Sequence, residues 1–474
     1  MTFRRILIAN RGEIAVRIIR TCRRLGIEAV LAASQEDLDT VPARLADATI
    51  CIGPAKAAAS YLNVGAIVDA ARTVRADAIH PGYGFLSENR NLARACASAG
   101  VVFIGPTEPQ LDAAGDKIRA RGHALAAGLP VLPGGEVHDT RQARRLAHEI
   151  GWPVLVKAAG GGGGRGIKHV RRPRDLGEAI ERATAEAGAA FGNSRVYLER
   201  FVESSRHVEV QLLGDGDRVI HFGDRDCSVQ RRYQKLVEEA PAPALSDGLR
   251  ADMQHAATVL GQHLRYRSAG TVEFLVDTDR EAYYFLEMNA RIQVEHPVTE
   301  AVCGVDLIAA QIAIAEGHDL RLAQADVTVT GHAIECRINA EDWTQGFRPD
   351  PGTVTEAVLP AGDGVRVDTH IQAGTRVPPF YDALMAKLIA VGTDRADALA
   401  RLHDALRRCE IRGVTTNLPM HTALVTDAEF IRGGVGTAWF SEYLNGHIDD
   451  IDHTSHMTPG RGSPKSGAAG GTDG

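Results

Sequence analysis

Five consecutive glycines at residues 160–164 separate two β-like segments of this chain, 154–157 and 167–170. A glycine run has no side chains to pack or to shield its backbone, so it favours a loop whose N–H groups can surround an anion. Lys157 ends the first segment, but no Gly-Lys-Ser/Thr string follows the glycines, which excludes a Walker A loop. The run therefore predicts a hairpin flap that closes over phosphate groups, and a plain flexible hairpin is the alternative.

The basic residues are distributed unevenly between the two types. Lys and Arg together number 53, and the lysines among them are Lys56, Lys117, Lys157, Lys168, Lys235, Lys387 and Lys465. Where a chain uses Arg so freely, a retained Lys indicates a place where a planar guanidinium cannot replace a compact ammonium. Lys117 and Lys157 are therefore candidates to bind phosphate.

Size, composition and charge exclude several classes of protein. With 474 residues and 50.7 kDa, the chain should form two to four packed units. Its apolar runs fall short of the ~20 residues that a membrane-spanning helix needs, and the N-terminal run is too short for a signal peptide. Seven cysteines without a Cys-x-x-Cys pair favour free thiols, and Cys227 is expected to be an inert core thiol. A net charge of −7 gives no attraction to nucleic acid. Together with the short apolar runs and the free thiols, this leads us to expect a cytoplasmic globular protein without nucleic-acid or membrane partners.

The first unit, residues 1–112, alternates short β-like runs with helical stripes, which is typical of a parallel sheet built from βαβ units. The first apolar stripe consists of Ile14, Ile18, Cys22 and Leu25. The turn before it, residues 10–13, reads Asn-Arg-Gly-Glu and lacks the Gly-x-Gly-x-x-Gly string of a pyrophosphate site. We therefore predict a Rossmann-like unit that binds no dinucleotide.

The second unit, residues 113–330, brings longer helices and a glycine-rich lid at about 130–205. Two runs within it, 208–212 and 271–275, alternate apolar and polar side chains with a period of two. Such alternation predicts an antiparallel sheet with one polar face. A third unit is expected at residues 331–446.

Residues 447–474 are rich in Gly, Ser, Thr and Pro. Segments of this composition bury too little apolar surface to offset the entropy of ordering. We therefore expect a disordered tail.

Glu273 and Glu287 lie on two β-like runs joined by a polar stretch about residue 280. A hairpin folded there places the two carboxylates opposite each other on one face, where like charges destabilise unless a cation lies between them. Asn289 shares the parity of Glu287, so the cluster offers oxygen ligands only. Such a set suits Mg2+ or Mn2+ and is unsuited to Zn2+. Two solvated glutamates on an exposed face are the alternative.

Polar side chains recur at alternate positions directly after this hairpin, at Asn289, Arg291, Gln293 and Glu295. In an extended chain they face one direction. A strand with Arg, Gln and Glu on one side is suited to gripping a small anion with a carboxylate as base. A second polar cluster, residues 224–239, contains Lys235.

Taken together, these strings resemble the biotin carboxylase family of ATP-grasp enzymes, from residue 8 to about residue 434. The strings that carry the likeness are Ile8-Ala-Asn-Arg-Gly-Glu-Ile-Ala15, His80-Pro-Gly-Tyr-Gly-Phe-Leu-Ser-Glu-Asn89, Phe103-Ile-Gly-Pro106, Arg291-Ile-Gln-Val-Glu-His-Pro-Val-Thr-Glu300, Gly331-His-Ala-Ile-Glu-Cys-Arg-Ile-Asn-Ala-Glu-Asp342 and Pro378-Pro-Phe-Tyr-Asp382. The resemblance implies an α/β ATP-grasp fold with an N-terminal Rossmann-like domain and a C-terminal biotin carboxylase domain. It also implies that ATP and bicarbonate form carboxyphosphate, whose CO2 then carboxylates biotin.

The resemblance implies a role for individual residues as well. Residues expected to bind the nucleotide are Lys117, Lys157, Gly162, Gly163, Gly164, Glu199, Arg200, Val202, His207, Gln230 and Tyr233. Glu273, Glu287 and Asn289 are expected to hold the metal ion. Glu295 is expected to be the base for bicarbonate. The bicarbonate anion itself is expected to be held by Lys235, Arg291, Gln293 and the backbone of Val294. Arg337 is expected to stabilise the biotin enolate.

Two positions depart from the pattern of some family members, namely Tyr233 in place of His and Arg200 in place of Lys. The only lysine after Lys387 is Lys465, which lacks the flanking Met of a biotinylation site. The resemblance therefore implies a separate biotin carboxyl carrier protein and a separate carboxyltransferase, and a homodimer is common in the family. The complete enzyme is expected to be an acetyl-CoA carboxylase of fatty acid biosynthesis or another acyl-CoA carboxylase.

Two alternatives remain at this point. One is a different ATP-grasp ligase that forms carboxyphosphate and passes it to another acceptor, and the other is a catalytically silent nucleotide-binding regulator. The silent regulator predicts lost ligands, yet Glu273, Glu287, Lys157, Glu295 and Arg337 are all present.

Overall fold

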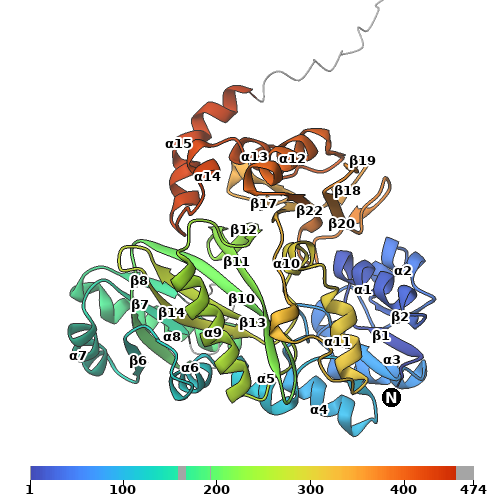
Figure 1. The fold of residues 1–474 in the computed structure, drawn as a ribbon, viewed down its shortest axis with the longest axis horizontal. Helices are drawn as coiled ribbons and strands as arrows, with labels where there is room; N and C mark the ends of the chain where they lie inside the picture. The colour runs from blue at the N-terminus through green and yellow to red at the C-terminus, as the bar shows by residue number, and fades with distance from the viewer. Residues whose placement is uncertain (1, 159–166, 193, 455–474) are drawn as a thin grey trace, which may run out of the picture.

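The structure of the protein is a computed structural model that describes residues 2–158, 167–192 and 194–454 (Figure 1). The glycine run at 160–164, which includes the predicted nucleotide-binding residues Gly162, Gly163 and Gly164, lies outside the described residues. Residues 455–474, most of the predicted tail, lie outside them as well.

The N-terminal part is a five-stranded sheet in the order β3-β2-β1-β4-β5, with every neighbouring pair parallel. Its elements are β1 (Arg5–Ile8), α1 (Gly12–Arg24), β2 (Glu28–Ala33), α2 (Val41–Leu45), β3 (Ala48–Cys51), α3 (Val64–Thr73), β4 (Ala78–His80), α4 (Arg90–Ser98) and β5 (Val102–Phe103). Ile6, Leu7 and Ile8 of the central strand are all fully buried, as expected where helices cover both faces of a parallel sheet. The predicted Rossmann-like architecture is confirmed.

The predicted apolar stripe of α1 is wrong at one position. Ile14, Ile18 and Cys22 are buried, but Leu25 is 44% exposed. Leu25 is the C-cap of the helix and keeps helical dihedral angles, and the chain turns away directly after it, at Gly26 with a φ of +72°. Leu25 therefore lies at the exposed end of the helix.

An eight-stranded antiparallel sheet forms the centre of the molecule, in the order β14-β13-β10-β11-β12-β15-β22-β20. Its strands are β10 (Ser205–Asp215), β11 (Val219–Arg231), β12 (Gln234–Ala240), β13 (Arg267–Asp277), β14 (Ala282–Asn289), β15 (His332–Asn339), β20 (Val365–Thr369) and β22 (Leu384–Gly392). Because β12 pairs with β15, one sheet joins the regions predicted as the second and third units.

The period-two prediction for this sheet is confirmed. Val208, Val210 and Leu212 of β10 pack in a hydrophobic cluster with residues of α9 (Asp247–His263). Glu209 and Gln211, on the other face, are also fully buried. The polar face is therefore closed off by other parts of the chain, and its charges must be compensated inside the protein.

A smaller antiparallel sheet, in the order β6-β9-β7-β8, lies where the lid was expected. Its elements are β6 (Gly134–Val137), α7 (Thr140–Ile150), β7 (Val154–Ala158), β8 (Ile167–Val170), α8 (Leu176–Phe191) and β9 (Val196–Arg200). Apolar residues of α7 and α8 form one cluster with those of the strands, so the two helices cover one face. β7 and β8, the described strands on either side of the glycine run, pair antiparallel with each other.

The remaining elements connect and cover these sheets. The remaining helices are α5 (Glu108–Gly115), α6 (Lys117–Ala126), α10 (His296–Cys303), α11 (Leu307–Ala315), α12 (Arg395–Arg408), α13 (Leu418–Leu424), α14 (Ala428–Arg432) and α15 (Trp439–Thr454). The short strands are β16 (Glu341–Asp342), β17 (Arg348–Pro349), β18 (Gly352–Thr353), β19 (Glu356–Val358), β21 (Arg376–Val377) and β23 (Glu410–Arg412). Apolar side chains of α1 share a cluster with Leu213 of β10 and Leu307 of α11, which packs the N-terminal part against the central sheet.

Helix α15 corrects the predicted start of the disordered tail, because residues 447–454 continue that helix. Its first turns are anchored by the buried side chains of Trp439, Phe440 and Tyr443, and no proline interrupts it. All seven cysteines are free, as predicted.

No single helix among residues 2–158, 167–192 and 194–454 has the length and apolar composition needed to cross a membrane. Taken together, α10 and α11 meet that test of length and composition, but they are bent by 95° relative to each other.

Candidate active site

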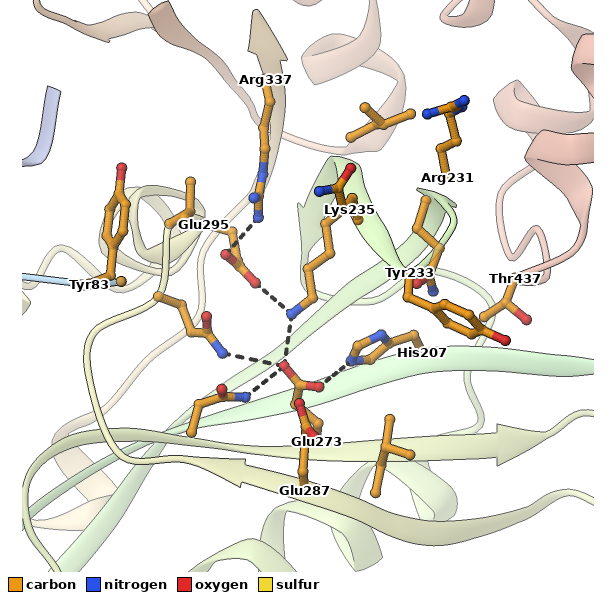
Figure 2. A pocket seen from close by; sticks show the side chains of 18 of the residues that line it. Tyr83, His207, Arg231, Tyr233, Lys235, Glu273, Glu287, Glu295, Arg337 and Thr437 are labelled. Carbon is orange, nitrogen blue, oxygen red and sulfur yellow. Dashed lines mark hydrogen bonds and ion pairs between the residues drawn. The ribbon is translucent and has the colours of Figure 1, made fainter. Parts of the chain in front are cut away.

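A cavity of about 770 Å3 lies where the N-terminal part, the small sheet and the central sheet meet. Tyr83 and Glu88 reach it from the N-terminal part, Lys157 from β7, and Arg337 from β15. Figure 2 shows charged side chains from several strands converging in it. Segments far apart in the sequence therefore build one polar chamber.

Nearly all described residues that the sequence predicted for the site line this cavity. They are Lys117, Lys157, Arg200, Val202, His207, Gln230, Tyr233, Lys235, Glu273, Glu287, Asn289, Arg291, Gln293, Val294, Glu295 and Arg337. Glu199 is buried beside the cavity and forms an ion pair with Lys157.

Glu273 of β13 and Glu287 of β14 are paired residues of the predicted hairpin, which turns at residues 278–281. Each carboxylate is met by an ammonium: Lys235 Nζ lies 2.9 Å from Glu273 Oε1, and Lys117 Nζ lies 2.8 Å from Glu287 Oε2. Asn289 Nδ2 donates to Glu273 Oε1 at 2.9 Å. The three side chains thus share one face and present carboxylate and amide oxygens, a donor set that fits Mg2+ or Mn2+.

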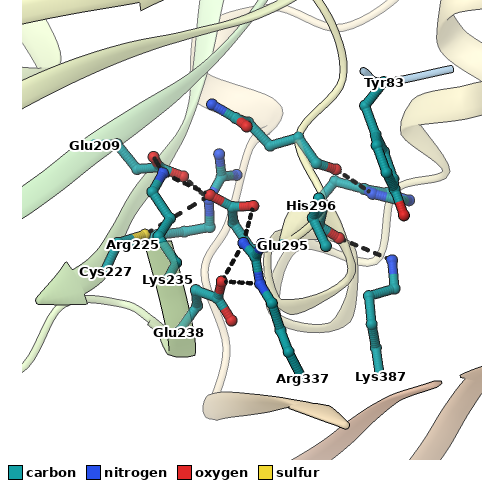
Figure 3. Close-up of polar contacts among 12 residues, drawn as sticks. Tyr83, Glu209, Arg225, Cys227, Lys235, Glu238, Glu295, His296, Arg337 and Lys387 are labelled. Atoms are coloured by element: carbon teal, nitrogen blue, oxygen red, sulfur yellow. Dashed lines mark hydrogen bonds and ion pairs between the residues drawn. The ribbon is translucent and has the colours of Figure 1, made fainter. Parts of the chain in front are cut away.

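Lys235 is the cation on which the buried acids converge. Its Nζ lies 2.9 Å from Glu273 Oε1 and 2.7 Å from Glu295 Oε1 (Figure 2). It also lies 2.6 Å from Glu209 Oε2 (Figure 3). Burial alone lowers the pKa of the Lys235 ammonium, but these carboxylates and Cys227 outweigh burial and raise it well above its ordinary value. Lys235 is therefore a permanent cation at the centre of the site.

Within residues 2–158, 167–192 and 194–454, two groups of acidic, His or Cys side chains bring their ligand atoms within 4.8 Å of one another. One contains His207, Glu209 and Glu273, and the other contains Glu209, Cys227 and Glu295. The Lys235 ammonium already binds an acid of both groups, so their negative charge is compensated without an ion.

Glu295 and Arg337 meet at the far side of Lys235. Arg337 Nη2 donates to Glu295 Oε2 at 2.9 Å, and its Nε donates to Glu238 Oε1 at 2.6 Å (Figure 3). Burial raises the pKa of the Glu295 carboxyl, but Lys235, Arg337 and Arg225 outweigh burial and hold it well below its ordinary value. Glu295 is therefore ionised at neutral pH.

The prediction that residues 289–295 form one strand is wrong. β14 ends at Asn289, and the chain continues through a bend and a turn to α10, which begins at His296. Arg291 leaves the sheet because Glu88 of the N-terminal part binds it, with 3.0 Å between Arg291 Nε and Glu88 Oε2. The side chains still converge on the cavity, but an irregular loop rather than strand alternation brings them there.

The other end of the cavity carries the residues predicted for the nucleotide. The Arg200 guanidinium lies over the ring of Tyr284, and its Nη2 donates a hydrogen bond to the Tyr284 hydroxyl at 3.1 Å. Tyr233 is 51% exposed and occupies the two-residue β11–β12 turn, where Arg232 and Tyr233 both have positive φ, as a type I′ turn requires. Leu155, Leu275 and Leu286 add an apolar lining. This end of the cavity combines apolar side chains with cations.

Several contributors were not assigned from the sequence. Glu209 and Arg225 are fully buried and form an ion pair of 2.6 Å beneath Lys235. The sequence does indicate Glu209, because its run alternates polar and apolar residues like the run that contains Glu273. In the structure the two glutamates are cross-strand partners. Cys227 is buried as predicted, yet its Sγ lies 3.9 Å from Glu295 Oε1, so it borders the site. Glu238 has no such signal, because its role depends on Arg337 far along the chain.

Two lobes, the small sheet and the central sheet, thus face a common cavity that carries lysines and paired glutamates. This fold and site define the chain as an ATP-grasp enzyme, an ATP-dependent ligase.

Comparisons with known proteins identify the family. Residues 2–111 match the model described as biotin carboxylase, N-terminal domain, and residues 335–442 match the biotin carboxylase C-terminal domain. Residues 116–323 match the ATP binding domain of the carbamoyl-phosphate synthase L chain. A biotin carboxylase of Nostoc sp. is 49% identical over 445 residues, which cover 93% of this chain and 99% of that protein. The chain belongs to the biotin carboxylase family.

Two solved structures share the fold over nearly the whole chain. The biotin carboxylase domain dimer of Hydrogenobacter thermophilus 2-oxoglutarate carboxylase, in complex with MgADP, ADP and bicarbonate, is 43% identical with a TM-score of 0.91, covering 94% of this chain and 99% of that one. The biotin carboxylase of Campylobacter jejuni, in a β,γ-ATP complex, is 43% identical with a TM-score of 0.91, covering 93% and 99%.

Glu238 gives the site a testable pH signature. Burial raises the pKa of Glu238 to about 7, and the charge of Glu295 adds to this despite the opposing Arg337. The folded protein keeps the proton up to about pH 7, whereas the unfolded chain releases it near the ordinary glutamate value, so the Glu238 contribution to stability is lost as pH rises from about 4.5 to 7. We expect the free energy of unfolding of the wild type, relative to Glu238→Gln, to fall by at most about 1.4 kcal/mol per pH unit in this window.

Urea unfolding of both proteins between pH 4.5 and 7 measures this slope. Glu410→Gln, at an exposed site, should run parallel to the wild type. Wild-type and Glu238→Gln curves that stay parallel contradict the assignment.

Proposed function

We propose a division of labour among the cavity residues for the biotin carboxylase half-reaction that this family of ATP-dependent ligases carries out. The observation that carries it is the position of the Glu295 carboxylate, which lies within hydrogen-bond distance of both Lys235 and Arg337. A base is thereby set between a cation on the nucleotide side and a guanidinium on the opposite side. The reaction needs such a centre, because bicarbonate must react first with ATP and then deliver CO2 to biotin.

The nucleotide end binds ATP. Lys117 and Lys157 carry compact positive charge into the cavity and bind the phosphates together with the glycines of the flap. The nucleoside is held by Glu199, Arg200, Val202, His207, Gln230 and Tyr233. Glu273, Glu287 and Asn289 would hold Mg2+ or Mn2+, which would supply positive charge to the phosphates.

Bicarbonate binds beside Glu295. Lys235, Arg291, Gln293 and the Val294 N–H form the anion site around it. Glu295 removes the bicarbonate proton, and the freed oxygen attacks the γ-phosphorus while the bond to ADP breaks. The products are ADP and carboxyphosphate, which decomposes to CO2 and phosphate.

Arg337 serves the second step. Its guanidinium is bound by Glu238, and its backbone carbonyl accepts hydrogen bonds from Asn417 and His421. The phosphate released from carboxyphosphate takes the N1′ proton of biotin, and a fixed donor of this kind stabilises the resulting enolate of the ureido group while N1′ attacks CO2. CO2 is used where it forms, at the meeting point of Glu295 and Arg337.

The biotin arrives on a separate carrier protein, and a separate carboxyltransferase uses the carboxybiotin. The match to the Nostoc biotin carboxylase, over 99% of that protein, supports a separate carrier. The seven free cysteines support a cytoplasmic enzyme, and the dimer described for the H. thermophilus domain supports a homodimer. The final acceptor, acetyl-CoA for fatty acid biosynthesis or another acid, is set by the carboxyltransferase.

The decisive experiment is ATP hydrolysis measured with bicarbonate, with and without free biotin. We expect hydrolysis to require bicarbonate and to be stimulated by biotin, with carboxybiotin as product. Bicarbonate-dependent hydrolysis without any effect of biotin contradicts the biotin site and favours a ligase with another acceptor.

Glu295→Gln should lower the rate of bicarbonate-dependent turnover by about 10²- to 10⁴-fold, because the amide cannot accept the bicarbonate proton. ATP binding should be retained, because Glu295 lies away from the nucleotide end. Steady-state kinetics and nucleotide titration measure the two effects. Glu281→Gln, an exposed glutamate in the β13–β14 turn, is the matched control. Full activity in Glu295→Gln excludes the base role.

Arg337→Ala should lower the rate of biotin carboxylation by about 10²- to 10³-fold through loss of the oxyanion partner. ATP binding should change little, which a titration with ADP checks. Arg412→Ala, an exposed arginine of the same region, controls for loss of surface charge. Equal loss of carboxylation and nucleotide binding would instead indicate misfolding.

A further inference from the structure

Lys387 is an interior lysine to which the reaction above gives no role. It lies on β22, its side chain is 0% exposed, and it does not line the cavity. Its Nζ lies 3.0 Å from Glu13 Oε1 and donates to the backbone carbonyl of Val294 at 2.8 Å. One ammonium thus joins β22, the start of α1 and the loop that carries Glu295. Figure 3 shows Lys387 on the side of this loop where His296 lies.

The loop at residues 293–295 has no strand partner, so its peptide groups depend on other contacts. The Val294 carbonyl, whose peptide plane carries the N–H of Glu295, is bound by Lys387. The preceding carbonyl, of Gln293, is bound by His296 Nδ1 at 2.8 Å, and its peptide plane carries the Val294 N–H. Because a carbonyl only accepts, this His296 nitrogen carries the hydrogen. Two successive peptide planes are therefore each held by a hydrogen bond to their carbonyl oxygen.

Glu13 extends this connection to the cavity wall. Its Oε1 accepts a hydrogen bond from the Tyr83 hydroxyl and also faces Lys387. Tyr83 lines the cavity from the N-terminal part. Lys387 and Glu13 together link an N-terminal wall residue to the loop that carries the base.

The other acids around Lys387 are already compensated. Asp368, the cross-strand partner of Lys387, is bound by Arg366. Burial raises the pKa of Glu335 well above its ordinary value despite Lys387, which favours the uncharged form of this carboxyl. Glu13 and the Val294 carbonyl are therefore the acceptors that hold the ammonium.

We propose that Lys387 is a positioning residue for the bicarbonate step: its buried ammonium anchors the Val294 carbonyl and thereby aims Glu295 and the adjoining peptide N–H groups into the cavity. The acceptors come from two separate segments, α1 and the loop, and the site is closed to solvent. A compact ammonium satisfies both without the space that a guanidinium needs.

This inference rests on the proposed function, because it assumes that Glu295 and Val294 handle bicarbonate. The test is Lys387→Met, which keeps an unbranched chain of similar length and removes the donor. We expect kcat/KM for bicarbonate to fall by about 10- to 100-fold, as for a misplaced reacting group. Binding of ADP should stay within about 2-fold, since ground-state nucleotide contacts are unaltered. Lys56→Met, at an exposed lysine, is the matched control and should match the wild type.

A second variant separates positioning from folding. Lys387→Met leaves the Glu13 carboxylate buried without its cation, which destabilises the protein. The double variant Lys387→Met/Glu13→Gln removes both charges, so we expect a higher unfolding temperature than for Lys387→Met. Its kcat/KM for bicarbonate should nevertheless remain low, because the Val294 carbonyl still lacks its donor.

The outcomes are distinct. A Lys387→Met enzyme with wild-type kcat/KM for bicarbonate, or with equal losses for bicarbonate and ADP, overturns the inference. Recovery of bicarbonate kinetics in the double variant also overturns it, because the defect is then the unpaired charge. A wild type without bicarbonate-dependent, biotin-stimulated hydrolysis overturns the proposed function itself, and the inference with it.

Discussion

The Lys235 ammonium is the contact on which the geometry of the site depends. It projects from β12 and binds Glu209 of β10, Glu273 of β13 and Glu295 of the loop before α10. Three carboxylates buried so close together cannot stay ionised without cations between them. Arg225 behind Glu209 and Arg337 beside Glu295 supply the remaining positive charge. The central strands and the loop can therefore adopt this arrangement only as one electrostatic unit.

The same pairing prepares the cavity for anionic substrates. Lys117, Lys157 and Lys235 each bind a carboxylate of the protein, so none of them must be desolvated without a partner. In the proposed reaction, phosphate and bicarbonate oxygens take over as partners of these cations. The Lys235 ammonium is one of the cations that hold the pKa of Glu295 low. When bicarbonate binds Lys235, its negative charge weakens this effect, so Glu295 becomes a stronger base at the step in which it removes a proton.

Local periodicity and turn chemistry made part of this site predictable. The hairpin that pairs Glu273 with Glu287 follows from alternation and one polar turn, and the resemblance to a family named the residues beyond it. The strand predicted through Glu295 was wrong, because Glu88, some 200 positions earlier in the sequence, binds Arg291 outside the sheet. The joining of the second and third regions through β12 and β15 was likewise not predictable. Local sequence patterns do not report such long-range contacts.

The few lysines of the chain occupy positions whose contacts differ from those of its arginines. Arg225 uses its guanidinium on Glu209, Gln211, Thr271 and Thr299, a set of acceptors that a planar group with five donors can reach. Lys235 instead meets acceptors on β10, β13 and a loop, which surround one atom and suit an ammonium. Exposed Lys56 shows that not every lysine is constrained in this way. In a chain with only seven lysines, each buried lysine indicates a point where separate segments contact a single positive charge. Lys387 is such a lysine, although no sequence motif identified it.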